Sequence, residues 1–307
     1  MRTLITGGAG FIGSALANRL VAEGHTVLVL DDLTAGDARQ LDPAVLLTRG
    51  DVRDVPKLWS LLQQVDCVYH LAARVRVPES IYYPRDYNEV NVGGTVAVME
   101  AMRDTGVRRV VFASSAALYG EQAQQPIKES QAPSPNSPYG VSKIAAEYYV
   151  STLGALYEIE TVSLRIFNAY GPGQDLPPSY PPVIPQLLRQ AQTGGSLVIF
   201  GDGTQTRDFV YVQDVVDGLL LAATVEGANR AVINIGSGQG ICINELAELV
   251  GRVTSRDVGL LHNQGHSGGV CRLVADVSLA DKLLGWRPRT GLEEGLRCIL
   301  DQDPRFQ

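Results

Sequence analysis

The chain has 307 residues, of which 45% are hydrophobic and 19% are charged. That balance is typical of a folded chain with a sizeable core, and it excludes a disordered tail, a collagen and a coiled coil. Acidic residues outnumber basic ones, 33 to 26, for a net charge of −7. We therefore expect no nucleic-acid partner, because binding to phosphates needs a basic surface.

The sequence also predicts a cytoplasmic protein with no membrane attachment. No apolar stretch approaches the ~18–20 residues that span a bilayer. The first residues, Met1-Arg2-Thr3, run directly into an apolar segment and leave no room for a signal peptide. The cysteines are widely scattered, as expected of reduced thiols, and stand at Cys67, Cys242, Cys271 and Cys298. With no HExxH and no CxxC, we expect no metal site.

Short β-branched runs alternate with segments of helical periodicity in the first half of the chain. Strands are expected at residues 3–6, 26–30, 46–49, 67–70 and 107–113, and helices at 11–23, 55–64 and 91–105. Such nearly continuous apolar strands are typical of a parallel sheet, which is buried on both faces. The β-α-β order requires crossovers with helices on both faces. The predicted fold class is therefore α/β, with a doubly wound parallel (Rossmann) sheet.

The pattern changes after about residue 167. Residues 171–185 contain six prolines and are predicted to form a loop. Further helices are expected at 185–193, 212–224 and 244–254, and strands at 197–200 and 231–235. We predict that residues 1–168, with about 209–235, form the dinucleotide-binding domain. Residues 169–208 and 236–307 would form a smaller, interleaved C-terminal substrate lobe.

A glycine triplet follows the first predicted strand and opens the first predicted helix. Gly7, Gly10 and Gly13 permit a tight turn and close approach of a pyrophosphate to a helix N-terminus. Asp31 ends the second strand, where a carboxylate accepts hydrogen bonds from ribose hydroxyls and repels a 2′-phosphate. These two features together predict NAD, rather than NADP, as cofactor.

A tyrosine and a lysine stand four residues apart just after Pro138. On a helix, Tyr139 and Lys143 project from one face. A tyrosine is a poor base at neutral pH, but nearby positive charge lowers its pKa and favours a phenolate that can take a hydroxyl proton. The pair Ser114-Ser115 ends a strand at the edge where open α/β sheets bind ligands, and one of the two hydroxyls could bond the same substrate oxygen.

These motifs, together with others along the chain, resemble the extended short-chain dehydrogenase/reductase superfamily, in its nucleotide-sugar epimerase/dehydratase branch. The further motifs are DVRD at 51–54, HLAA at 70–73, NVGGT at 91–95, SSAALYG at 114–120, RIFNAYGP at 165–172 and GDGTQTRDFVYVQDV at 201–215. The similarity covers essentially the whole chain. It implies a bound NAD, a nucleotide-sugar substrate and a homodimer.

The resemblance also implies roles for individual residues. Ser115, Tyr139 and Lys143 would be catalytic. The cofactor would contact Gly7, Gly10, Phe11, Ile12, Gly13, Asp31, Asp32, Leu33, Thr34, Ala35, Gly36, Asp51, Val52, Leu71, Ala72, Ala73, Asn91, Tyr139, Lys143 and Phe167. The substrate would contact Ser115, Tyr139, Asn168, Val183, Phe200 and Arg207.

The residues after Ser115 bear on which reaction of the family is expected. Dehydratases and decarboxylases of this branch carry an acid there, whereas this chain has Ala116 and Ala117, which hold no transferable proton. The minimal Ser-Tyr-Lys set suits NAD-dependent C4 epimerisation through a transient 4-keto sugar, as in the 4-epimerases that act on UDP-glucose and UDP-galactose. The alternative is a 4-ketoreductase that uses external NAD(P)H on a nucleotide-linked keto sugar.

One segment departs from the family pattern. The family's RxGD segment, which contacts the nucleotide, is replaced here by His266-Ser267-Gly268-Gly269. The sequence therefore leaves the sugar and the nucleotide base open. For the homodimer, the resemblance points to the helix at 91–105 and the helix beginning near Tyr139. Their apolar residues belong either to the subunit seam or to the sheet-facing core, and they are Val96, Met99, Met102, Tyr149 and Leu153.

Overall fold

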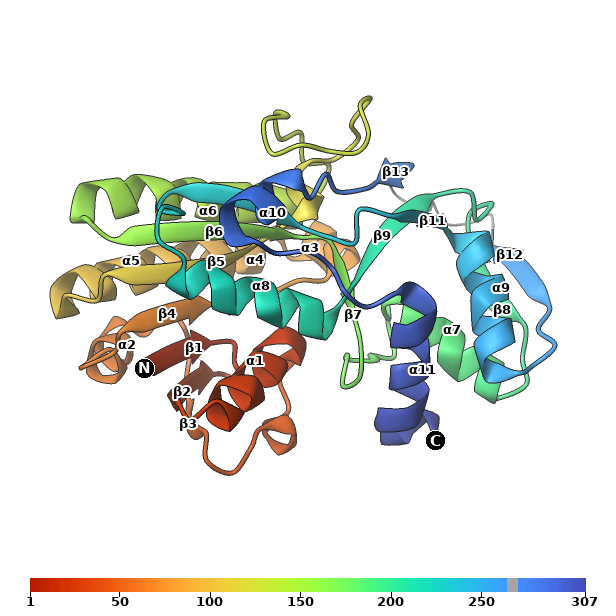
Figure 1. Cartoon of the computed structure of the whole chain (residues 1–307), viewed down its shortest axis with the longest axis horizontal. Helices are drawn as coiled ribbons and strands as arrows, with labels where there is room; N and C mark the ends of the chain where they lie inside the picture. Colours follow the sequence, from red (N-terminus) through yellow and green to blue (C-terminus); the bar gives the residue numbers. More distant parts are fainter. Residues whose placement is uncertain (264–269) are drawn as a thin grey trace.

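The computed structural model describes residues 1–263 and 270–307. Its larger part is a parallel seven-stranded sheet, on the left of Figure 1. The strands, in spatial order, are β10 (Ala231–Ile235), β6 (Glu160–Ile166), β5 (Arg109–Ser115), β4 (Cys67–His70), β1 (Arg2–Thr6), β2 (Thr26–Asp31) and β3 (Leu46–Arg49). Every neighbouring pair is parallel, so each connection crosses over the sheet through a helix or a long loop.

Helices cover both faces of this sheet. One face packs against α1 (Phe11–Ala22), α8 (Val212–Thr224) and α10 (Ser278–Leu284), and the other against α2 (Val55–Leu61), α5 (Gly94–Thr105) and α6 (Pro138–Tyr157). The strand interiors are almost wholly buried, which explains their nearly continuous apolar sequence. The predicted doubly wound α/β fold is confirmed.

Several boundaries differ from those expected, for local reasons. The strand expected at 107–113 is β5 (Arg109–Ser115), because Gly106 ends α5 with a φ of 75° and pairing with β6 continues to Ser115. The helix expected from residue 91 begins as a π-turn, Glu89–Gly93. The helix expected at 244–254 is α9 (Ile243–Thr254), and its cap is the Cys242 thiol, which accepts from the Glu245 N–H.

The smaller lobe, on the right of Figure 1, is built around β9 (Thr206–Tyr211). Its neighbours are β11 (Gly240–Cys242), β13 (Arg272–Leu273) and β7 (Asn168–Tyr170). A second small sheet pairs β8 (Leu197–Phe200) with β12 (Leu260–Asn263). The lobe's apolar core lies between these strands and α7 (Val183–Gln192), α9 and α11 (Leu292–Gln302).

The chain passes between the two parts several times. After β9, it returns to the large sheet through α8 and β10, then enters the lobe again. Near the C-terminus α10 and Trp286 pack in the core of the large part, before α11 closes the lobe. We therefore keep the two-domain division as a proposal, with residues 278–286 assigned by their packing to the dinucleotide-binding domain. Within the described ranges, no helix combines the length and apolar character needed to cross a membrane.

Candidate active site

A cavity of about 600 Å³ lies at the carboxyl ends of the central strands. This is the edge at which open α/β sheets bind ligands. Most of the residues predicted from the sequence line it, namely Gly7, Gly10, Phe11, Ile12, Gly13, Asp31, Asp32, Thr34, Ala35, Gly36, Asp51, Val52, Leu71, Ala72, Ala73, Ser115, Tyr139, Lys143 and Phe167. The fold thus gathers residues from seven separate segments of the sequence into one site.

The glycine turn leaves room for a phosphate. Gly7 has a φ of 73°, and a Cβ there would lie 2.7 Å from the backbone of Ala72. A Cβ on Gly13 would overlap the carbonyl oxygen of Gly7. Helix α1 begins directly after this turn, and no side chain of the described residues caps it. Its first N–H groups therefore remain available to an anion, so the turn fits the pyrophosphate of a dinucleotide.

Asp31 faces the cavity from the end of β2. One carboxylate oxygen accepts from the N–H of Ala9 and the other from the N–H of Leu33, both at 2.9 Å. Burial raises the pKa of this carboxyl, and the two backbone bonds oppose the rise. Leu33, predicted to contact the cofactor, is not among the lining residues and instead supports Asp31 through its N–H.

Asp51, at the same end of the cavity, is paired with an arginine that the sequence reasoning missed. Arg53 donates to both oxygens of Asp51, at 2.9 and 2.6 Å, and it also lines the cavity. This ion pair lowers the pKa of Asp51. The motif at 51–54 contains the signal, because an Asp and an Arg two residues apart in a turn can pair.

Tyr139 lies in the first turn of α6, buried beneath the cavity. The helix begins at Pro138, and the Ser137 hydroxyl caps it by accepting from the N–H of Gly140 at 3.1 Å. The Tyr139 ring packs edge-on against Tyr87, with 6.3 Å between ring centroids. Burial raises the pKa of Tyr139, whereas a hydrogen bond with the Ser115 side chain lowers it.

The structure distinguishes the two serines at the end of β5. Ser114 points into the protein and donates to the carboxylate of Glu147 at 2.6 Å. Ser115 points to the cavity, where its oxygen bonds Tyr139 and accepts from the N–H of Ala117 at 3.2 Å. Both serines line the cavity, but successive residues of a strand face opposite sides, so the Ser115 side chain bonds Tyr139 and the Ser114 hydroxyl bonds Glu147.

Lys143 lies one turn beyond Tyr139 on the same face of α6. Its ammonium donates to the carbonyl of Ala113 at 2.5 Å and lies 4.4 Å from the ring centroid of Phe112. Burial lowers the pKa of Lys143 to about 7, and the carboxylate of Glu147 opposes this shift. The side chain is therefore held close to its titration point at neutral pH.

Asn91, which was predicted to contact the cofactor, forms hydrogen bonds within the protein instead. Asn91 does not line the cavity, because its amide accepts from the N–H of Arg74 at 2.8 Å and donates to the Arg74 carbonyl at 3.0 Å and to Ser142 at 2.9 Å. It therefore ties the loop after β4 to helix α6.

The predicted substrate residues from the smaller lobe also lie outside the cavity. Asn168 donates to the Asp208 carbonyl at 3.0 Å, and Arg207 donates to the Val270 carbonyl at 2.6 Å. Val183 begins α7 and Phe200 ends β8. The segment His266-Ser267-Gly268-Gly269 lies outside the described residues.

Two residues that line the cavity form an ion pair. Arg76, in the loop after β4, pairs with Asp175 of the proline-rich loop at 2.9 Å, and both residues line the cavity. The C-terminal segment holds the proline-rich loop, since the Gly173 N–H donates to Asp303 at 2.9 Å and Arg305 donates to the Gln174 carbonyl at 2.8 Å. No pattern in the sequence indicates that these distant residues would form ion pairs or hydrogen bonds with one another.

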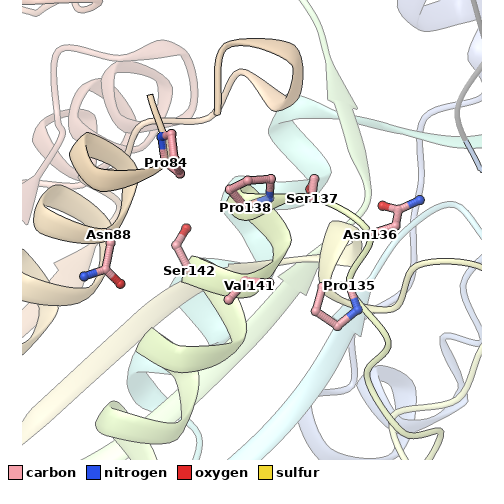
Figure 2. A pocket seen from close by; sticks show the side chains of 8 residues that line it. All are labelled: Pro84, Asn88, Pro135, Asn136, Ser137, Pro138, Val141 and Ser142. Carbon is pink, nitrogen blue, oxygen red and sulfur yellow. The ribbon is translucent and has the colours of Figure 1, made fainter. Parts of the chain in front are cut away.

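A second hollow, of about 570 Å³, lies outside this site (Figure 2). Pro84 and Asn88 of α4 (Pro84–Asn88) face Pro138, Val141 and Ser142 of α6 across it. No charged side chain of the described residues lines it, and Tyr139 and Lys143 do not reach it. It therefore offers no group for acid–base chemistry, and the cavity at the sheet edge is the candidate active site.

The fold and this site together define a dinucleotide-dependent enzyme. The chain belongs to the NAD dependent epimerase/dehydratase family. Residues 3–236 match the sequence pattern of that family. Family membership agrees with the fit of the glycine turn and Asp31 to NAD, which is the cofactor of the protein.

Three relatives of this chain are named as 4-epimerases of UDP-linked sugars. The UDP-glucose 4-epimerase of Streptomyces lividans is 37% identical, over 93% of this chain and 91% of its own. The crystal structure of the Thermotoga maritima UDP-glucose 4-epimerase with UDP-glucose superposes with a TM-score of 0.94, at 33% identity and with 98% of both chains covered. The UDP-N-acetylglucosamine 4-epimerase of Methanobrevibacter ruminantium, in complex with UDP-N-acetylmuramic acid, gives a TM-score of 0.93 at 33% identity, covering 98% of this chain and 97% of its own.

Proposed function

We propose that this protein is an NAD-dependent 4-epimerase of UDP-linked sugars, with UDP-glucose and UDP-galactose as the substrate pair. The observation that carries the proposal is the hydrogen-bonded pair of Ser115 and Tyr139, with Lys143 one turn away, on the floor of a dinucleotide cavity. The relatives named UDP-glucose 4-epimerase support the choice of substrate.

The residues of this site would act on one sugar hydroxyl. When bound, NAD supplies the acceptor and donor of hydride at C4. Tyr139, as phenolate, takes the proton of the O4 hydroxyl and later returns it to the same oxygen. Ser115 would donate a hydrogen bond to that oxygen. Lys143 lies on the same helix face, and when protonated its positive charge would favour the phenolate. The sugar must present its other face to complete epimerisation, and the net redox change is zero.

The environment beyond Ser115 supports epimerisation over dehydration. Ala116 and Ala117 follow it in a short 3₁₀ turn, and neither side chain carries a proton for a second step. A site that can only remove and return one proton is limited to oxidation and reduction at one carbon.

The proposal is tested by incubating the purified protein with UDP-galactose and following the C4 configuration by NMR, without added NAD or NADH. Conversion to UDP-glucose is expected. Oxidation that stops at a 4-keto sugar and consumes stoichiometric added NAD would instead identify a 4-ketoreductase running in reverse, and turnover of only GDP- or dTDP-sugars would refute the choice of nucleotide.

The smaller lobe would hold the UDP-sugar. Asn168, Val183, Phe200 and Arg207 come from four of its segments, and the Arg207 guanidinium, whose pKa is lowered by burial, would offer charge-assisted hydrogen bonds to the diphosphate. Leu33 and Asn91 are not proposed as cofactor contacts, because neither lines the cavity.

A homodimer formed through α6 is part of the proposal. The outward face of this helix exposes Val141, Tyr148, Tyr149 and Leu156, which recur at helical spacing. Exposed apolar patches of this kind mark interfaces, and a two-fold contact is the commonest arrangement. Met99 and Met102, considered for the seam, have no exposed area and belong to the core beneath α5. Leu156→Glu is expected to convert the dimer to a monomer in light scattering, whereas a wild-type monomer would refute the assembly.

The cytoplasm is the proposed compartment. All four cysteines are free thiols, from the buried Cys67 to the exposed Cys271, as suits a reducing environment.

A further inference from the structure

A chain of buried polar groups lies behind the catalytic face of α6. Glu147 accepts from the Ser114 hydroxyl at 2.6 Å and from two nitrogens of Arg165 at 2.6 and 3.1 Å. Arg165 also donates to the Tyr119 hydroxyl at 2.8 Å, and Tyr119 donates to Asn234 at 2.7 Å. No member is more than 5% exposed. This series of hydrogen-bonded side chains thus links β5, α6, β6 and β10 beneath the active site.

A gain in folding stability does not by itself explain the buried ion pair between Glu147 and Arg165. Transferring two charges from water to an apolar interior costs about as much as their attraction returns, so an apolar pair of similar volume is often as stable. A buried pair of this kind fixes geometry, because an apolar contact would tolerate several arrangements and bidentate hydrogen bonds tolerate one.

The geometry that the Glu147–Arg165 pair fixes is at the end of β5. Helix α6 holds two consecutive residues of this strand, through Lys143 to the Ala113 carbonyl and through Glu147 to the Ser114 hydroxyl. The next residue is Ser115, the partner of Tyr139. Because Tyr139, Lys143 and Glu147 are spaced by four residues on α6, one helix face sets both the base and the strand that carries its partner.

We propose that Glu147, held by Arg165, is a positioning residue that acts through Ser114 to keep the Ser115 hydroxyl aligned with Tyr139. The inference rests on the proposed function of Ser115 and Tyr139. Glu147 does not line the cavity, and the Ser114 hydroxyl is turned to Glu147, although Ser114 itself is among the lining residues. Glu147 therefore acts on the site through the strand.

Ser114→Ala tests this role, because it removes the tie to β5 and leaves the Glu147–Arg165 pair intact. We expect kcat for UDP-galactose to fall about tenfold, with KM and bound NAD unchanged, since misplacement of a reacting group acts on the chemical step. Ser114→Thr, which keeps the hydroxyl, should restore kcat. Ser163→Ala is the matched control, a buried serine on the neighbouring strand β6, and its kcat should stay within about twofold of wild type.

A second measurement does not depend on turnover. The ionisation of Tyr139 is followed by the near-ultraviolet difference spectrum between each protein and its Tyr139→Phe counterpart, with NAD bound. Around this phenol lie Ser115 of β5, Lys143 of α6 and Tyr87 of α4. Loss of alignment with Ser115 should raise the pKa of Tyr139 in Ser114→Ala and not in Ser163→Ala. An unchanged tyrosine titration together with unchanged kcat would overturn the inference. Absence of wild-type epimerisation alongside the expected titration shift would refute the proposed function and leave the positioning role supported.

Discussion

Replacing Tyr139 by Phe removes one hydroxyl from the site and leaves the ring in place. The lost interaction is a single hydrogen bond with Ser115, which is worth about 0.5–1.5 kcal/mol of stability. The edge-on contact with Tyr87 and the burial of the ring are kept. Loss of a general base slows a reaction by about 10²–10⁴-fold, or about 2.7–5.4 kcal/mol in the barrier. The increase in the activation free energy should therefore clearly exceed the decrease in the free energy of unfolding.

The assay compares three quantities in the same preparation, namely kcat for UDP-galactose, the NAD released on denaturation and the free energy of unfolding. Tyr87→Phe is the matched control, because it removes a hydroxyl that bonds the Arg76 carbonyl at 2.7 Å and Glu79 at 3.0 Å, away from the reacting oxygen. It should lose stability and keep kcat. If Tyr139→Phe retained more than about a tenth of wild-type kcat, its assignment as base would be refuted.

Three further predictions concern binding and stability. Arg207→Ala should weaken UDP binding in calorimetry by about 2–4 kcal/mol with bound NAD unchanged, and unaltered UDP affinity would show that the diphosphate is held elsewhere. Asp208→Ala should cost about 3 kcal/mol or more in denaturant unfolding, because its carboxylate accepts from three backbone N–H groups and a hydroxyl, whereas Asp202→Ala at an exposed turn should cost less than about 1 kcal/mol. Burial lowers the pKa of His70 from 6.5 to about 3, so unfolding takes up a proton between these values and stability rises with pH across that window. His70→Gln should flatten this part of the pH–stability curve, and an unchanged slope would contradict the assignment.

The sequence by itself determined the features whose geometry is local. The glycine turn, the carboxylate at the end of β2 and the four-residue spacing of Tyr139 and Lys143 each depend on one strand–turn–helix unit or one helical turn. Continuous apolar strands separated by helical segments were sufficient to predict the parallel sheet, because only a sheet covered on both faces buries them. The resemblance to a known family then supplied most of the lining of the cofactor cavity.

Only the tertiary structure decided the features that depend on two distant segments. The register and end of β5 direct the Ser115 side chain to Tyr139, and the packing of α6 on β5 and β6 brings the Ser114 hydroxyl to the Glu147–Arg165 pair. The tie from Asn91 to the Arg74 backbone and the ion pair between Arg76 and Asp175 likewise join segments whose sequences carry no mark of each other. The periodicity of apolar residues in the sequence determines which side of a helix or strand is apolar. The partner of a buried polar group depends instead on which other elements pack against it. For that reason the sequence was sufficient to name side chains that line the cavity, whereas the groups that hold them in place emerged only from the packed chain.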